Sequence, residues 1–395
     1  TDIGWIFSIA LFCLGASAAV FGKWVEKSGP RKTMFVSALC FSSGFFISAL
    51  GISLHQIWLM YLGSGVIGGI GLGLGYISPV STLIKWFPDR PGMATGMAIM
   101  GFGGGAMIAS PLSVWLMEKF SSESSVGVME TFATLGCLYL VVMVVGSWIV
   151  RIPADDWKPK NLVKKPPKTR KLITSENVMA DTAIKTRQFW LLFFVLMLNV
   201  SAGIGVLGQA SVMIQEMFSA ESVGEAAAVD TAYAAGFVGL LSLFNMLGRF
   251  IWSSLSDLIG RKNTYTIFFS LGIGLYILVP FAGAIGSLIL FICAFAIIIS
   301  MYGGGFATIP AYLRDLFGTK QVGAIHGRLL FAWSLAAIVG PVTINYMRDY
   351  QINTLNRPGD EVYNLTMYMM AGLLVIGLIL NLLVKPVKAK YHDKK

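Results

Sequence analysis

The sequence predicts an all-helical membrane protein built from two related helical bundles, and three observations support this fold class. The 395-residue chain is 55% hydrophobic and only 13% charged, whereas soluble domains carry about 25% charged residues. Apolar runs long enough to cross about 30 Å of hydrocarbon recur along the chain. Landmarks in the first half also recur in the second half at a fixed offset, which indicates an internal duplication.

Eleven apolar segments are long enough to span a bilayer, five before the polar stretch 151–188 and six after it. We expect membrane helices at 4–22, 33–52, 57–84, 92–117, 128–150, 189–213, 230–252, 264–284, 287–311, 325–347 and 366–384. The predicted organisation is an N-terminal bundle (1–150), a linker (151–188), a C-terminal bundle (189–384) and a tail (385–395).

The distribution of basic residues predicts the orientation of these helices. All but four of the 30 Lys and Arg residues lie in one alternating set of segments, namely 23–32, 85–90, 151–188, 257–263, 312–328 and the tail. Because cytoplasmic loops are enriched in Lys and Arg, we expect this set and the C-terminus on the cytoplasmic side of the plasma (inner) membrane. The net charge of +10 does not indicate nucleic-acid binding, since the charges lie between apolar spans.

The duplication has an offset of 230 or 231 residues. Three pairs of landmarks share it: Glu26 and Asp257, Phe87 and Phe317, and Pro111 and Pro341. Repeated halves of this kind are typical of secondary transporters. Subtracting the offset from the span 189–213 places its counterpart before residue 1. We therefore expect a twelve-helix fold in the complete protein, with the first helix missing from this chain.

Several stretches resemble a known family. An acid, a glycine three residues later and then basic residues occur in GKWVEKSGPRK (22–32) and SSLSDLIGRK (253–262). This pattern resembles the major facilitator superfamily, although Glu26 replaces the more usual Asp. The stretches 84–112, 244–262 and 312–341 are similar to the oxalate/formate antiporter family, which is related to the monocarboxylate transporters. The resemblance covers essentially the whole chain and implies the major facilitator fold.

Arg249 is the main candidate for an anion site. It lies in an apolar stretch without a carboxylate, eight residues before Asp257, which corresponds to about 12 Å of helix. A lipid-facing Arg at this depth costs at least ~2.5 kcal/mol, so the side chain should face a polar interior. The duplication places Ala18 at the equivalent position, so the shared architecture does not require the charge. One polar stripe at helical spacing contains Ser242, Asn245, Arg249, Ser253 and Ser256.

The residues alone leave two interpretations of Arg249 open. It is either a structural arginine that snorkels or pairs with a distant acid, or an anion site. In the family resembled, an arginine at this motif position contacts the substrate carboxylate, and the planar guanidinium suits carboxylate geometry. The resemblance therefore implies that Arg249 binds the substrate, while Asn245, one turn earlier, orients Arg249 or the substrate.

Several aromatic residues are candidates for the rest of the site, although packing alone would also account for them. The resemblance implies an aromatic cage around a small carboxylate, formed by Tyr76, Phe102, Tyr302 and Phe306. Trp333 falls where the oxalate exchangers carry a lysine. One Arg and one Trp offer a single positive charge, which favours a monocarboxylate such as lactate, pyruvate or formate over the dianion oxalate.

Two further features of the presumed cytoplasmic side are candidates for coupling and gating. His326 lies at the cytoplasmic start of its span, where it is either a solvated loop histidine or a proton-coupling group. The loops 26–32 and 257–262 are interpreted as conformational latches. Their residues Glu26, Arg31, Asp257 and Arg261 are expected to bridge helix ends in one state and to release them in the other.

The predicted function is secondary active transport of a small organic anion, preferably a monocarboxylate, by alternating access with proton symport or anion exchange. An oxalate/formate-type dicarboxylate exchanger and a transporter-like carboxylate sensor remain alternatives. We expect no enzyme activity, cofactor or metal site, because the spans contain no nucleophile–base or metal-ligand constellation. The expected partners of this presumed monomer are a small carboxylate, a proton or counter-anion, and the lipid bilayer, but no nucleic acid.

Overall fold

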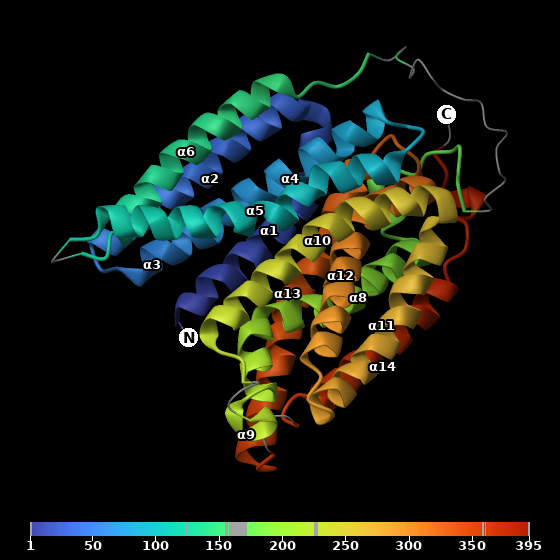
Figure 1. The fold of residues 1–395 in the computed structure, drawn as a ribbon. Helices are drawn as coiled ribbons and strands as arrows, with labels where there is room; N and C mark the ends of the chain where they lie inside the picture. The colour runs from blue at the N-terminus through green and yellow to red at the C-terminus, as the bar shows by residue number, and fades with distance from the viewer. Residues whose placement is uncertain are drawn as a thin grey trace.

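The computed structural model describes residues 2–122, 125–154, 157, 172–224, 228–357, 359 and 361–393. Segment 158–171 of the predicted linker, including its KKPPK run, lies outside the described residues. Within the described residues, eleven helices are long and apolar enough to cross a membrane, as predicted (Figure 1).

Five of these membrane helices belong to the first half of the chain. They are α1 (Asp2–Ser28), α2 (Pro30–Ser53), a composite of α3 (Ile57–Met60), the π-helical segment η1 (Tyr61–Ile67) and α4 (Gly68–Trp86), then α5 (Pro91–Phe120) and α6 (Val128–Ile149). The other six are α8 (Arg187–Met217), α10 (Thr231–Ile259), α11 (Arg261–Ala284), α12 (Leu288–Phe317), α13 (Val322–Asn353) and α14 (Asn364–Leu382). Short helical turns are α7 (Ala180–Ala183), α9 (Ala220–Val223) and η3 (Ala389–Tyr391).

Glycines form three of the turns at one end of the molecule. Gly29, Gly260 and Gly318 have φ angles of 78°, 94° and 82°, a conformation that glycine adopts without a steric cost. Gly29 separates α1 from α2, Gly260 separates α10 from α11, and Gly318 follows α12. We call this end the basic end, because it contains the basic-rich loops of the sequence.

The predicted loops at the basic end are too long. α1 continues to Ser28 instead of ending near residue 22, and only residues 318–321 separate α12 from α13. Hydropathy marks where a helix leaves hydrocarbon, whereas intrahelical hydrogen bonds continue the helix beyond that point. The charged side chains at these helix ends therefore project from regular backbone.

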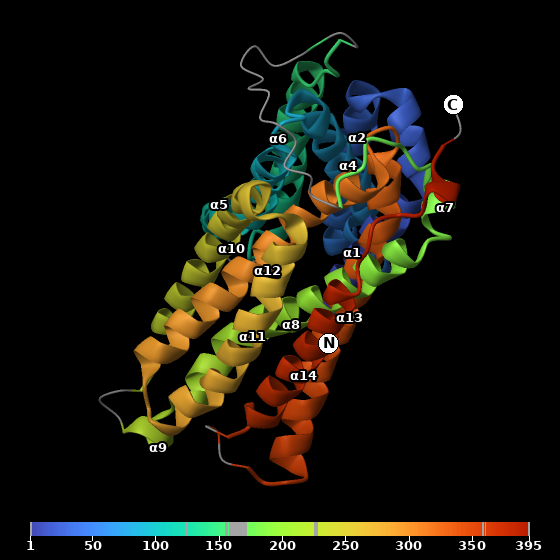
Figure 2. The same cartoon turned by 90° about the vertical axis from the view of Figure 1, so that its right-hand side faces the viewer.

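The two halves of the chain meet through two helix pairs. α1 packs along α13, and α5 packs along α10. In Figure 1, α2, α4, α5 and α6 lie on one side, while α11, α12 and α14 lie on the other, with α1 and α13 between them. Figure 2 shows α8 and α14 beside α13. The predicted domain boundaries at 150 and 189, and the helix expected before residue 1, stay predictions.

α5 and α10 touch near the basic end and diverge toward the opposite end. A Cβ added to Gly96 of α5 would lie 2.0 Å from Ser253 Oγ of α10, so the backbones approach closely there. At Gly105 and Gly239, by contrast, no neighbouring atom of the described residues lies within 4 Å of an added Cβ. A cavity of about 620 Å³ opens between the two helices in this region and is lined by residues that include Ser242. The contact between the halves is therefore closed at the basic end and open at the other.

Candidate functional site

Arg249 projects from the middle of α10 into the protein interior, where it is only 2% exposed. Its Nε donates a hydrogen bond of 3.1 Å to Asn245 Oδ1, one turn earlier. Within the part of the chain that the structure describes, Arg249 pairs with no carboxylate and its Nη1 has no hydrogen-bond partner. A guanidinium has five N–H donors and matches a carboxylate in a two-bond geometry. The buried side chain thus retains donors for an anion.

Glycines on the neighbouring helices allow the backbone to approach this arginine. A Cβ at Gly103 of α5 would lie 2.7 Å from Arg249 Nε. A Cβ at Gly303 of α12 would lie 2.5 Å from Asn245 Oδ1. Because any larger residue would meet these polar atoms, the glycines permit α5 and α12 to enclose the guanidinium.

Four aromatic rings gather around the guanidinium. Arg249 Cζ lies 5.1 Å from the ring centroid of Phe306 and 5.5 Å from that of Phe102. The Phe306 ring lies 5.4 Å from Tyr76 and 5.5 Å from Trp333. These rings come from α4, α5, α12 and α13, and so from both halves of the chain. We call Tyr76, Phe102, Phe306 and Trp333 the aromatic cage.

Tyr302 lies next to the cage and packs toward α8. It is 5% exposed, and it precedes Phe306 by one turn of α12. An added Cβ at Gly203 of α8 would lie 2.6 Å from the Tyr302 ring, so this ring joins α8 to α12. Arg249 and Trp333 belong to its electrostatic surroundings. The structure thus brings the seven predicted substrate residues together, and Tyr302 adjoins Arg249 and Trp333 while it also packs on α8.

The cage is closed on the side of the C-terminal half and open on the side of the N-terminal half. Phe306 and Trp333 are 2% and 3% exposed, whereas Phe102 is 40% exposed. A groove of about 380 Å³ adjoins Phe102. We call it the N-side groove, and its lining residues are Met34, Ser37, Leu72, Gly75, Tyr76, Pro79, Val80, Ala98, Phe102, Val142, Met143 and Gly146.

His326 is buried within α13, so its interpretation as a solvated loop histidine is wrong. The side chain is 1% exposed, because α13 already begins at Val322 and α1 packs along it. The imidazole lies 5.6 Å from the Tyr76 ring. Neither ring nitrogen has a hydrogen-bond partner among the described residues. His326 therefore adjoins the cage on its basic-end side.

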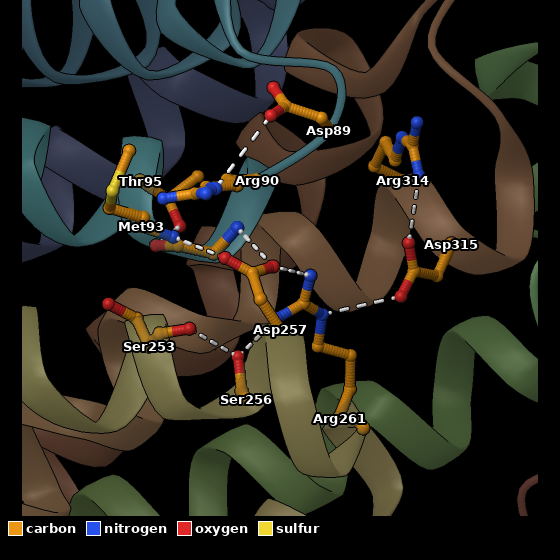
Figure 3. Close-up of polar contacts among 12 residues, drawn as sticks. Asp89, Arg90, Met93, Thr95, Ser253, Ser256, Asp257, Arg261, Arg314 and Asp315 are labelled. Carbon is orange, nitrogen blue, oxygen red and sulfur yellow. Dashed lines mark hydrogen bonds and ion pairs between the residues drawn. The ribbon is translucent and has the colours of Figure 1, made fainter. Parts of the chain in front are cut away.

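Asp257 connects the two halves at the basic end (Figure 3). Its carboxylate accepts hydrogen bonds of 2.9 Å from the backbone N–H groups of Gly92 and Met93, in the first turn of α5. It also pairs with Arg261, which contacts Asp315 at 3.3 Å. A carboxylate at a helix N-terminus satisfies free N–H groups and interacts favourably with the helix dipole. These contacts tie α10 to α5 across the closed end.

Glu26 makes the equivalent contact in the other direction. Its carboxylate accepts a hydrogen bond of 2.9 Å from the backbone N–H of Gly323, in the first turn of α13, and pairs with Lys85 at 3.0 Å. Arg31 differs from the other predicted latch residues, because it donates to the backbone oxygen of Trp148 within the same half. The structure thus places Glu26, Asp257 and Arg261 at the junction between the halves, but not Arg31.

The sequence analysis missed Asp181, which lies in α7 between the halves. It pairs with Lys23 of α1 and with Arg328 of α13. Hydrogen bonds from these two cations lower the pKa of Asp181 to about 2. The partners lie 158 and 147 residues away in the sequence, so no local pattern indicates the contact.

Comparison with known proteins identifies relatives along most of the chain. The family model of the Major Facilitator Superfamily matches residues 1–341. The transporter YhjX of Escherichia coli is 26% identical over 337 residues, which cover 84% of this chain and 76% of YhjX. The oxalate:formate antiporter of Oxalobacter formigenes is 27% identical over 321 residues, covering 81% and 69%. Human monocarboxylate transporter 12 is 23% identical over 354 residues, covering 85% and 66%.

Solved structures share the fold at lower identity. The fucose:proton symporter of Escherichia coli superimposes with a TM-score of 0.69, covering 96% of this chain and 90% of that chain at 12% identity. The proton:xylose symporter XylE gives a TM-score of 0.68, covering 96% and 85% at 14% identity. These structural matches show the fold alone.

Proposed function

Because this chain belongs to the Major Facilitator Superfamily and is an integral membrane transporter of that fold, we propose that it transports small monocarboxylates through the aromatic cage. Two relatives are an oxalate:formate antiporter and a monocarboxylate transporter, which supports a small organic acid as the substrate. The observation that carries the proposal is the buried guanidinium of Arg249, which faces the cage without an acidic partner in the described chain.

The charge of the cage favours a single carboxylate. Arg249 supplies one positive charge, and Trp333 supplies an indole N–H rather than a second cation. A second carboxylate beside Trp333 would be buried without a counter-ion, which costs several kcal/mol even after relaxation. We therefore propose that oxalate binds at least ~10-fold more weakly than lactate or pyruvate, a difference of about 1.4 kcal/mol.

The proposed mechanism is alternating access between the two halves. We place the basic end and the C-terminus in the cytoplasm of a plasma-membrane protein, on the strength of the Lys and Arg distribution. Substrate would then enter through the cavity between α5 and α10 and reach Arg249 from outside. Release into the cytoplasm would require the contacts of Asp257 and Glu26 at the basic end to open. Labelling of single cysteines at 28 and 390 from opposite faces would contradict this orientation.

Counterflow in proteoliposomes tests the substrate proposal. Vesicles loaded with one acid are given labelled lactate or pyruvate, with formate, lactate, pyruvate and oxalate as competitors. We expect Arg249→Ala to abolish uptake. Arg249→Lys keeps the charge but loses the planar fork, and hydrogen bonds to charged groups contribute about 1.5–3 kcal/mol. We therefore expect at least a ~10-fold loss for Arg249→Lys. Arg357→Ala is the control, because Arg357 forms an exposed pair with Glu361.

Three outcomes would count against parts of the proposal. Unchanged affinity in Arg249→Ala would remove the anion-anchor role. Stronger inhibition of the wild type by oxalate than by monocarboxylates would favour a dicarboxylate exchanger, whereas Trp333→Lys is the variant expected to shift preference toward oxalate. Binding without accumulation of label inside the vesicles would indicate a sensor.

A further inference from the structure

We infer that a groove between the basic ends of α2 and α6 binds the headgroup of an anionic phospholipid. The groove has a volume of about 460 Å³ and is lined by Arg31, Lys32, Phe35, Ser147, Trp148 and Arg151. We call it the α2/α6 groove. The inference goes beyond the proposed function, because it concerns a surface outside the aromatic cage.

The charge of the α2/α6 groove is entirely positive. Three of its six lining residues are cations, and none is an acid. Lys32 and Arg151 are exposed, and neither forms an ion pair in the described chain. A groove lined by charges of one sign concentrates their field, which favours an occupant of the opposite sign.

Arg31 joins the two helices at this groove. One of its guanidinium nitrogens, Nη2, donates a hydrogen bond of 2.9 Å to the backbone oxygen of Trp148, at the end of α6. A guanidinium has five N–H donors, so this bond leaves others for an anion. The residue that does not take part in the junction between the halves therefore brings the cations of α2 and α6 to one place.

The cations lie at the level that a phospholipid headgroup occupies. Lys32 immediately precedes the apolar run 33–52, and Arg151 immediately follows the run 128–150. Because such runs cross the hydrocarbon of the bilayer, both charges lie just outside it. Trp148, which lines the groove, is 71% exposed, and tryptophan is enriched at the interface between hydrocarbon and water.

α2 and α6 also offer an exposed apolar surface on the hydrocarbon side of the groove. α6 is the least buried of the eleven described membrane helices and packs beside α2 (Figure 1). Leu39, one turn beyond Phe35, is 46% exposed, and Val145, one turn before Trp148, is 54% exposed. The surface is thus charged at headgroup depth and apolar at the depth of acyl chains, which matches the chemistry of an anionic phospholipid.

The C-terminal half uses the equivalent cations differently. Arg261 and Lys262 lie 230 residues after Arg31 and Lys32. Arg261 pairs with two carboxylates, and Lys262 donates to two backbone oxygens at the end of α14, at 2.7 and 3.0 Å. The equivalent charges are therefore already bound within the protein.

The groove at that equivalent position also has a different lining. It has a volume of about 430 Å³, and its lining includes Asp315 together with Leu172 and Ile173 of the linker. The α2/α6 groove has neither an acid nor a linker residue among those that line it. Basic residues at helix ends set the orientation of a membrane protein, but that role is common to both halves and does not explain why only one groove keeps its charges free.

Native mass spectrometry of the full chain tests the inference. The protein in detergent is mixed with phosphatidylglycerol or with phosphatidylcholine of the same acyl chains, and the retained lipid is measured. We expect at least a ~10-fold preference for phosphatidylglycerol. Lys32→Gln/Arg151→Gln should lower its affinity at least ~10-fold, or about 1.4 kcal/mol, because two basic residues near an anionic lipid surface together contribute more than this.

The matched control removes two exposed charges beside the other groove. Lys385→Gln/Lys388→Gln lowers the net charge by the same amount, and both lysines are exposed at the same end of the molecule. We expect phosphatidylglycerol retention within about twofold of the wild type. The first double variant leaves Arg31 and its bond to α6 in place, so its unfolding midpoint without added lipid should equal that of the wild type.

Photolabelling of the wild type makes the test independent of how the variants fold. Phosphatidylglycerol with a diazirine on one acyl chain should label segments 35–39 and 145–149. Labels confined to other segments, equal retention of the two lipids, or equal losses in the two double variants would overturn the inference. Displacement of phosphatidylglycerol by inorganic phosphate at the same concentration would overturn the lipid assignment, because it would show a site for a free anion.

Discussion

The two halves enclose the cage to different degrees, and the C-terminal half contains α8, which has no counterpart among the described helices of the first half. In the most apolar part of α8, 78% of the residues are buried, compared with 17% in the most apolar part of α6. In the C-terminal half, α8 packs against α13, α14, α10 and α12, and its Gly203 lies against the ring of Tyr302. The position 230 residues before Tyr302 is Leu72, which lines the N-side groove.

This difference places the charge and the opening of the cage on opposite sides. Arg249 belongs to the half in which α8 fills the interior and is itself only 2% exposed, so an electrostatic interaction there is stronger than in water. Phe102 belongs to the half with the groove and remains partly exposed. The anion anchor is therefore held by packed helices, while the groove beside Phe102 lies in the half that has no counterpart of α8 among the described helices.

The largest expected effect concerns access to the two walls of the cage. We expect Phe102→Cys to react with a small water-soluble maleimide at least ~10-fold faster than Phe306→Cys, because full burial requires an opening step and 1.4 kcal/mol already corresponds to a factor of ten. Labelling would be measured by mass spectrometry in a background without Cys13, Cys40, Cys137 and Cys293.

The ratio of the two labelling rates is the quantity to compare, because either substitution alone perturbs the cage. Equal rates would mean that both walls of the cage are covered alike.

A smaller effect is expected from one added methyl group in each half. A Cβ at Gly203 would lie 2.6 Å from the Tyr302 ring, whereas a Cβ at Gly146, which lines the N-side groove, would meet no described atom within 4 Å. Overpacking typically costs 1–3 kcal/mol, while Gly to Ala in an open helix position gains up to about 1 kcal/mol. Gly203→Ala should therefore lower the midpoint of thermal unfolding in detergent, and Gly146→Ala should leave it unchanged or raise it. Equal losses in both variants would contradict the difference in filling.

The smallest expected effect concerns the contact between the halves at Asp181. In Asp181→Asn, Lys23 of α1 and Arg328 of α13 would face each other without their shared counter-ion, which favours separation of the basic end. Because exposed ion pairs contribute only about 0–1 kcal/mol, we expect at most a fewfold increase in labelling of a cysteine at Ser81, which is buried near Gly323. Asp393→Asn, which removes the exposed pair with Lys320 within one half, should have no such effect.

The pH dependence of this difference follows from the lowered pKa of Asp181. A depressed carboxyl pKa contributes stability that is present above the unfolded value, near 3.9, and is lost as the pH falls through about 2. The ratio of labelling between Asp181→Asn and the wild type should therefore stay constant from pH 5 to pH 8. A ratio that changed within this window would show that another group titrates in the contact.

Much of the fold could be predicted because it depends on local composition. The eleven membrane helices follow from hydropathy, and the turns at Gly29 and Gly260 follow from glycine at the end of each duplicated motif. The burial of Arg249 could also be predicted, since comparison with Ala18 separated what the architecture needs from what one half adds. The family resemblance then directed attention to Tyr76, Phe102 and Phe306.

The rest depends on contacts that no local window contains. His326 meets Tyr76 from a position 250 residues away, and its burial is decided by how α1 lies on α13. Hydropathy near residue 326 could not distinguish a covered helix face from a solvated one. Asp181 has the same difficulty, since a single acid in a polar stretch acquires its role only when both halves supply a cation.

The glycines along α5 and α10 have one further consequence. The small residues would allow these two helices to pack closely at either of their ends. The two helices are in close contact at Gly96, whereas Gly105 and Gly239 leave the backbone uncovered at the far end. A tilt that moved the close contact to the far end would meet no bulky side chain at these glycines. We expect the balance between the two packed arrangements to be set mainly by the carboxylates of Asp257 and Glu26, whose hydrogen bonds and ion pairs at the basic end can form and break. Steric barriers would contribute little. Gly239→Trp should therefore block close packing at the far end and leave the contact at Gly96 unchanged.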